Sequence, residues 1–296
     1  MGKIVAGIDG SASAKNAAVW AAREAARRQD TLRLVHAYVV PAGGYPTFVA
    51  RLPQLREGMQ QQGREWLDEA RDAVLESVSG LEVETDLIEG QPAAVLTAES
   101  RTARSVVLGS RGLGGFTGML VGSVAVSLAA HGHSPVAVVR GRRPADPVPT
   151  EGPVVVGVDG SEPGAAALAL AFDAASVRKT PLVAVHVWND VTADAGLGVY
   201  PLAVDPDELA RNARTVLDEA LSEWQSKYPD VTVEPVVARG RPVRTLLEYA
   251  ERAQLVVVGS RGRGGFQGML LGSTSQALVI HSPCPVVVTR AEDAEA

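Results

Sequence analysis

Short apolar runs alternate with longer amphipathic or alanine-rich segments along the whole chain. Apolar runs of about four to eight residues are typical of buried strands, and longer periodic segments are typical of helices. In the first half this pattern predicts strands over residues 3–8, 31–39, 82–89, 105–108 and 135–139. It predicts helices over 13–28, 55–79, 92–103 and 123–132, with a loop containing proline and glycine over 41–53.

The second half of the chain repeats the first at a constant offset of 150 residues. Residues 4–11 return as 154–161, and the glycine-rich residues 109–123 return as 259–273. A period this long indicates a duplicated domain rather than a solenoid of short repeats. We therefore expect one domain at 1–140, a linker containing several prolines at 141–152, a second domain at 153–290 and an acidic tail at 291–296.

Each half is expected to be an α/β domain with a doubly wound parallel sheet and helices on both faces, because its strands alternate with helices. A ligand of such a sheet binds at the carboxyl ends of the strands, where the strand order reverses. If the first and fourth strands are neighbours at that reversal, Asp9 and the loop after Leu108 flank one crevice.

The composition supports this fold class and disfavours two kinds of partner. Hydrophobic residues make up 46% of the chain and aromatic residues only 4%. The core is therefore expected to consist of Val, Leu, Ile and Ala, as in parallel strands packed on alanine-rich helices. The net charge of −6 argues against binding to nucleic acid or to an anionic membrane, which requires a basic surface.

Three further features predict a cytoplasmic protein. The single cysteine, Cys284, cannot form an intrachain disulfide, and we interpret it as a packed thiol near a strand. No apolar run reaches the length of about 18 residues that a membrane span requires. The first residues run directly into a predicted strand and lack the pattern of a signal peptide.

The candidate chemistry lies in a glycine pattern after the fourth strand of each half. Gly109, Gly112, Gly122 and Ser123 are spaced Gly-x2-Gly-x9-Gly-Ser, and the spacing recurs within 259–273. Glycines let a backbone approach phosphates without a Cβ clash, and a helix start attracts an anion. The alternative is a flexible surface loop with a capping serine. The pattern is neither a P-loop, which requires Gly-Lys-Ser/Thr, nor the Gly-x-Gly-x-x-Gly of dinucleotide-binding folds.

Other polar residues near the strand ends have structural interpretations as well. Residues 9–11, Asp-Gly-Ser, are compatible with a turn and a helix cap, and beside the glycine loop they are also compatible with a ligand role. His36 and His186 lie on apolar runs and are interpreted as core or crevice-edge residues rather than catalysts. The other histidines and the cysteine lack the spacing of a metal site, so we predict no metal ligand from the protein. No convincing general base, P-loop lysine or pair of carboxylates accompanies the glycine loop, so we predict no catalytic residue.

These residues together resemble the universal stress protein family. The resemblance rests on Asp9 after the first strand and on the Gly-x2-Gly-x9-Gly-Ser spacing after the fourth, and it covers both halves. It implies a tandem member of the ATP-binding branch, of the kind common in actinobacteria. It also implies an adenine nucleotide alpha hydrolase-like parallel sheet of five strands in the order 3-2-1-4-5. ATP would lie in the crevice, with Mg²⁺ or Mn²⁺ carried on its phosphates.

The resemblance assigns nucleotide-binding positions in each half. Gly7 and Asp9 would border the adenosine, Ala37 would meet the adenine edge, and the loop and the next helix start would hold the phosphates. The positions in the first half are Gly7, Asp9, Ala37, Leu108, Gly109, Ser110, Arg111, Gly112, Leu113, Gly114, Gly115, Gly122, Ser123 and Val124. The positions in the second half are Gly157, Asp159, Val187, Val258, Gly259, Ser260, Arg261, Gly262, Arg263, Gly264, Gly265, Gly272, Ser273 and Thr274. Because Arg263 replaces Leu113, the second site is expected to be more cationic.

The residues and the resemblance together predict a binding and signalling module. It would hold one ATP per domain with little or no turnover, and would regulate growth or a stress response as a homodimer through a protein partner of unknown identity. We expect it to bind neither nucleic acid nor membrane. A slow ATPase or nucleotidyl-transfer enzyme is the alternative. A nucleotide-free dimerising scaffold is a third alternative, which the two intact glycine motifs disfavour.

Overall fold

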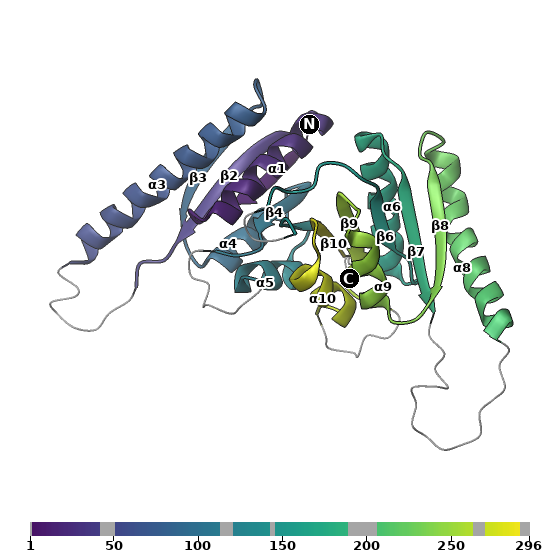
Figure 1. Cartoon of the computed structure of the whole chain (residues 1–296). Helices are drawn as coiled ribbons and strands as arrows, with labels where there is room; N and C mark the ends of the chain where they lie inside the picture. The colour runs from purple at the N-terminus through teal and green to yellow at the C-terminus, as the bar shows by residue number, and fades with distance from the viewer. Residues whose placement is uncertain are drawn as a thin grey trace, which may run out of the picture. The chain divides into compact units, whose positions relative to one another are not determined.

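The computed structural model describes residues 2–41, 51–112, 121–142, 146–188, 206–262 and 270–290. The chain divides into two compact units, Met1–Arg140 and Gly141–Ala296. In each unit strands alternate with helices along the chain (Figure 1).

The first unit is built around a parallel sheet with the strand order β3-β2-β1-β4-β5. In register, Val5 of β1 pairs with Arg33 on one side and with Val106 on the other. The first two crossovers run from β1 outward to β3, and the later ones run back past β1 to β4 and β5. Crossovers of one hand that run in opposite directions place their helices on opposite faces, so α1 packs with α3 and α4 packs with α5. The elements are β1 (Lys3–Gly7), α1 (Ala12–Arg28), β2 (Thr31–Tyr38), α3 (Leu52–Ser77), β3 (Val83–Glu89), α4 (Pro92–Glu99), β4 (Ser105–Gly109), α5 (Ser123–His131) and β5 (Val136–Val139).

The second unit has the same topology, with the strand order β8-β7-β6-β9-β10 and parallel pairing throughout. The two units thus confirm the predicted fold class and strand order. The elements are β6 (Val154–Gly157), α6 (Glu162–Arg178), β7 (Leu182–Trp188), α8 (Pro206–Lys227), β8 (Val233–Arg239), α9 (Pro242–Ala250), β9 (Leu255–Gly259), α10 (Ser273–His281) and β10 (Val286–Thr289).

Small aliphatic residues form most of the core, as the composition predicts. In the first unit α1 packs against β1 and β4, and its small side chains allow a close approach to the sheet. The fully buried residues of this helix face include Ala17, Ala18, Ala21 and Ala25. The second unit adds an aromatic contribution, because Phe172 of α6 is fully buried and stacks with Trp224 of α8 and with Tyr228, which follows that helix.

Most helix ends of the first unit lie within two residues of the prediction, and two differ by more. α3 begins at Leu52 rather than at residue 55, and the predicted loop therefore ends earlier. A proline in the first turn of α3 is compatible with the helix, because its fixed φ is already helical and its missing N–H has no partner there. α4 ends at Glu99 rather than at residue 103, because residues 101–102 turn and the Arg104 N–H then donates to the Lys3 carbonyl.

The predicted linker and tail are only partly described. Residues 141, 142 and 146–152 carry neither helix nor strand, and the tail at 291–296 lies outside the described residues. In the part of the chain that the structure describes, no helix has both the length and the apolar character needed to cross a membrane.

Cys284 lies between α10 and β10 and is fully buried. Burial raises the pKa of its thiol to about 12, while a hydrogen bond with Ser282 partly opposes this rise. The Cys284 N–H also donates to Ser282 Oγ at 3.3 Å. This environment agrees with the interpretation of the residue as a packed thiol.

We expect Cys284 to react with an aromatic disulfide reagent at pH 8 only after unfolding, because the folded protein does not form the reactive thiolate. Native labelling should be at least about 100-fold slower than labelling in denaturant. As a control, the same assay in denaturant should count one thiol per chain.

The raised pKa of Cys284 also predicts a contribution to the free energy of unfolding that is complete below about pH 8.5 and is lost as the pH rises toward 12. Rapid labelling of the native protein would contradict both expectations.

Candidate functional site

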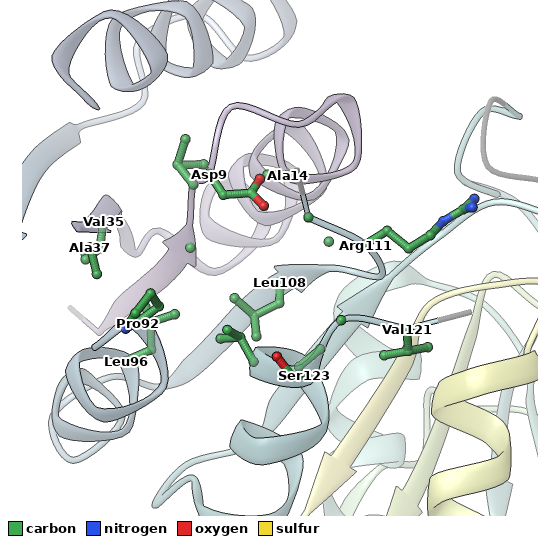
Figure 2. Close-up of a pocket in the computed structure, with 17 residues that line it drawn as sticks. Asp9, Ala14, Val35, Ala37, Pro92, Leu96, Leu108, Arg111, Val121 and Ser123 are labelled. Atoms are coloured by element: carbon green, nitrogen blue, oxygen red, sulfur yellow. The ribbon is translucent and has the colours of Figure 1, made fainter. Parts of the chain in front are cut away.

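A cavity lies at the carboxyl ends of β1 and β4, where the strand order of the first unit reverses (Figure 2). Open α/β sheets bind ligands at this point, because the connections leave the two strands in opposite directions. The cavity has a volume of about 260 Å³, close to the lower end of the range for small-molecule sites, about 300 Å³. The lining residues are Gly7, Ile8, Asp9, Ala14, Val35, Ala37, Pro92, Leu96, Leu108, Gly109, Arg111, Gly112, Val121, Gly122, Ser123, Val124 and Ala125.

Asp9 is held in a turn that follows β1. Its Oδ1 accepts hydrogen bonds from the Ser11 N–H at 3.0 Å and from the Ser11 hydroxyl at 2.6 Å. Gly10 has a φ of 83°, in the left-handed region that glycine adopts without strain. Ser11 is also the N-cap of α1, because its Oγ accepts from the Ala14 N–H at 3.1 Å. The residues therefore form both the turn and the helix cap that the sequence suggests, with Asp9 at the cavity wall.

The loop after β4 passes directly against this turn. A Cβ at Gly112 would collide with Asp9 Oδ2, so a side chain at this position would displace the Asp9 carboxylate. A Cβ at Gly109 would lie 2.6 Å from the carbonyl carbon of Ser13, in the first turn of α1. Glycine at these two positions therefore allows the loop and the start of α1 to share one crevice.

The first turn of α5 forms another wall of the crevice. Its N-cap is Gly122, with φ −69° and ψ 146°, which offers no side-chain acceptor to the first turn. The Gly122 N–H donates to the Ser110 carbonyl at 2.9 Å and so fixes the helix start beside the β4 loop. Ser123 follows and is exposed. The N–H groups of such a first turn, together with the helix dipole, are suited to bind an anion.

The cavity has two chemically different ends. Figure 2 shows Ala37, Pro92 and Leu96 at one end, and Arg111 leaving the loop at the other. The apolar end suits a flat hydrophobic group. Arg140 follows β5 and is not among the lining residues. Burial, with a further effect of the Arg111 charge, lowers the pKa of the Arg140 guanidinium. Arg111 therefore places a positive charge at the end where the loop and the helix start also lie.

The second unit repeats these contacts. Asp159 Oδ1 accepts from the Ser161 N–H at 3.0 Å and from the Ser161 hydroxyl at 2.6 Å. A Cβ at Gly262 would collide with Asp159 Oδ2. Gly272 caps α10 without a side chain, and its N–H donates to the Ser260 carbonyl at 2.7 Å. The repeated residues thus produce the same local geometry in both halves.

The two units differ at residues close to the loop and to the helix start. Pro163 takes the place of the serine at position 13, and its carbonyl oxygen lies 3.4 Å from the Thr289 hydroxyl. Ser275 takes the place of an alanine and donates to the Gly259 carbonyl at 2.5 Å. The expected cationic difference depends on Arg263, which lies outside the described residues.

The structure brings ten of the predicted positions of the first half to the one cavity: Gly7, Asp9, Ala37, Leu108, Gly109, Arg111, Gly112, Gly122, Ser123 and Val124. Ser110 is not among the lining residues; it is buried, and its carbonyl accepts the hydrogen bond from the α5 cap. The predicted positions that lie outside the described residues are Leu113, Gly114, Gly115, Arg263, Gly264 and Gly265.

The predicted positions of the second half lie on the equivalent elements of its sheet. Gly157 ends β6, Asp159 lies in the turn after it, and Val187 lies in β7. The remaining described positions lie at the end of β9, in the loop after it or at the start of α10. Besides Gly157 and Val187, the positions are Asp159, Val258, Gly259, Ser260, Arg261, Gly262, Gly272, Ser273 and Thr274.

Seven lining residues are absent from the prediction: Ile8, Ala14, Val35, Pro92, Leu96, Val121 and Ala125. One sequence signal points to part of this set, because the Gly-x-Pro of residues 90–92 recurs at 240–242 at the start of the equivalent helix. The others are small or aliphatic residues that pattern analysis assigns to the core. Nothing in their spacing distinguishes a core wall from a cavity wall.

Comparison with known proteins finds relatives over nearly the whole chain. The sequence model of the Universal stress protein family matches residues 1–140 and 152–290. A universal stress protein of Mycobacterium tuberculosis strain H37Rv is 39% identical over 290 residues, which cover 97% of this chain and 96% of the relative. Another from the same strain is 40% identical over 302 residues, which cover 97% and 94%.

Solved structures show the same fold. A universal stress protein from Archaeoglobus fulgidus DSM 4304 superimposes with a TM-score of 0.70 and covers 98% of each chain. Its sequence identity to this chain is 20%, so the likeness concerns the fold alone.

Replacing Ser11 with Ala should lower the free energy of unfolding by about 1 kcal/mol, because it removes the helix cap of α1 and the hydroxyl that Asp9 accepts from. Urea unfolding followed by circular dichroism measures the change. Ser161→Ala should have the same effect on the second unit. Ser11→Thr keeps the hydroxyl and should stay within about 0.5 kcal/mol of the wild type. An equal loss for Thr and Ala would show that the cap is not the cause.

Proposed function

Because the chain belongs to the universal stress protein family, we propose that each half binds one ATP and that nucleotide occupancy regulates a stress or growth response. One observation carries the proposal. In both units an Asp turn, a glycine loop that meets it and a glycine-capped helix start converge where the sheet order reverses. Each part has a chemical counterpart in a nucleoside triphosphate.

The polar end of the crevice suits the phosphates. The N–H groups at the start of α5, beginning with Ser123, offer donors and a positive dipole end to an anion. Gly112 lets the loop backbone approach without a side chain, and Arg111 adds a positive charge at the same end. This combination supports binding of a charged phosphate chain without a P-loop lysine.

A divalent cation fits this proposal as a companion of the nucleotide rather than as a ligand of the protein alone. Among the described residues, no group of three His, Cys, Asp or Glu side chains is placed to bind a metal ion. Mg²⁺ or Mn²⁺ bound to the phosphate oxygens would neutralise part of their charge. The protein would supply backbone donors to the oxygens that the cation leaves exposed.

The other end of the crevice suits an adenosine. Val35, Ala37, Pro92 and Leu96 form an apolar wall that fits the flat face of a purine. Asp9 lies between this wall and the loop, and a carboxylate there can accept hydrogen bonds from ribose hydroxyls. The order of these groups along the cavity matches the order of base, sugar and phosphates in ATP.

The lining residues favour a binding module over an enzyme with rapid turnover. Among the residues that line the described cavity, Asp9 is the carboxylate, and its Oδ1 already accepts two hydrogen bonds from Ser11. Within the described part of the chain, the lining residues include no histidine or lysine that could act as a base or hold the transferring phosphoryl group. We therefore propose slow or no hydrolysis. We further propose that the protein is a cytoplasmic homodimer and acts through a protein partner, as the family resemblance implies.

Native mass spectrometry of the full chain with ATP and Mg²⁺ should show two nucleotides per chain. Asp9→Ala and Asp159→Ala should each leave one nucleotide, and the double variant should bind none, because each change removes the carboxylate of one site only. Asp9→Asn, which keeps the side-chain shape, serves as the control for folding. No bound nucleotide in the wild type would contradict the proposed function. Phosphate release at about 1 per second or faster would favour the enzyme instead.

Gly112→Ala should weaken ATP binding at the first site at least about ten-fold, because the added methyl group displaces the Asp9 carboxylate. Isothermal titration in the Asp159→Ala background isolates that site. Gly58→Ala is the matched control, since a Cβ at this helical position meets no atom within 4 Å. It should leave ATP binding unchanged and stabilise the fold by about 0.5–1 kcal/mol. Unchanged binding by Gly112→Ala would contradict the close packing of loop and turn.

A further inference from the structure

Two buried histidines lie beside the turns that carry the aspartates. His36 in β2 and His186 in β7 are 7% and 8% exposed. The Nδ1 atom of His36 lies 2.7 Å from the Ile8 carbonyl oxygen, and that of His186 lies 2.6 Å from the Val158 carbonyl oxygen. A carbonyl oxygen can only accept, so each Nδ1 carries a hydrogen and donates it. His36 is not among the residues that line the cavity, and the proposed phosphate contacts involve neither histidine.

The two accepting carbonyls belong to the residues that immediately precede Asp9 and Asp159. The Ile8 N–H still follows the β1–β2 ladder, because it donates to the Val35 carbonyl at 2.8 Å. The chain then turns away from the sheet, and His36 on the neighbouring strand supplies the donor for the Ile8 carbonyl. Both backbone polar groups of Ile8 are thus bonded to β2, which fixes the direction in which the chain enters Asp9.

The surroundings of the two imidazole rings differ, although the hydrogen bond is the same. In the first unit a Cβ at Gly63 of α3 would lie 2.6 Å from His36 Cδ2, and the Trp66 ring packs edge-on at 5.2 Å. At the offset of 150 residues the second unit has Ala213 and Val216 in these places. The feature that both sites share is therefore the donor to the carbonyl and not one particular packing of the ring.

We propose that His36 and His186 are positioning residues for nucleotide binding. Each holds the peptide group before the aspartate so that the carboxylate faces the ribose, without touching the nucleotide itself. The inference rests on the proposed function, and it adds to that proposal by naming the group that orients the aspartate of each ATP site. Without the donor, the buried carbonyl of Ile8 or Val158 loses its partner, and the turn after it loses one of the bonds that fix its direction.

His36→Asn and His36→Leu form a matched pair that tests the hydrogen bond. The two substitutes have the same branching and similar volume, but only Asn carries a nitrogen donor at about the position of Nδ1. Titration of ATP in the Asp159→Ala background isolates the first site. We expect Leu to raise the dissociation constant at least about ten-fold, and Asn to stay within about three-fold of the parent. His186→Asn and His186→Leu in the Asp9→Ala background should behave in the same way.

Two further measurements separate positioning from a general loss of structure. AMP binding should weaken by the same factor as ATP binding in His36→Leu, because both ligands carry the ribose. Binding of inorganic tripolyphosphate should remain at the parent level, because the loop and helix start are intact. Should His36→Leu fail to fold, His36→Gln replaces it, since its amide reaches beyond the Nδ1 position and should weaken ATP binding as Leu does.

Three results would overturn the inference. Parent-level ATP binding by His36→Leu, or by its replacement His36→Gln, would show that the bond does not orient the aspartate. Equal weakening by Asn and Leu would assign the effect to the ring itself. Equal loss of ATP and tripolyphosphate binding would indicate a structural role only. A failure of the proposed function looks different, because the unmodified chain would then bind no ATP at all.

Discussion

The structure of each unit depends on one close approach, between the aspartate turn after the first strand and a glycine in the loop after the fourth. Asp9 meets Gly112 in the first unit, and Asp159 meets Gly262 in the second. The approach is possible because β1 and β4, and likewise β6 and β9, are neighbours in the sheet. Reversal of the strand order at this point leaves room above the strand ends, and glycine keeps that room from being filled by a side chain.

The comparison of the two halves separates what the site requires from what it tolerates. The serine caps, the aspartate turns and the histidine bonds to a backbone carbonyl recur with nearly the same distances. Residues behind them change, from Ser13 to Pro163 and from Trp66 to Val216. The recurring bonds all orient backbone or carboxylate groups at the crevice. Among the substituted residues, Ser13 accepts a hydrogen bond from the Arg111 N–H, and Trp66 packs against the His36 ring. Duplication has thus kept the orienting contacts while the packing around them varied.

Much of the fold could be predicted because its signals are local. Apolar runs and alanine-rich faces predict the strands and helices, and their alternation predicts the parallel sheet that the structure confirms. The helix ends were less predictable: α3 begins at Leu52, and α4 ends at Glu99. Such ends depend on a proline in a first turn and on a long-range hydrogen bond to Lys3, and hydrophobic periodicity contains neither.

The sequence by itself determined the duplication, the fold class, the aspartate turns and the glycine loops, because each is encoded by residues close together in the chain. Only the tertiary structure decided that Pro92 and Leu96 of α4 line the same cavity as Asp9, and that His36 donates to the carbonyl before it. Periodicity shows which side of an element is buried, but a core wall and a cavity wall are equally apolar. Their difference arises when distant strand ends meet, and no local pattern records that meeting.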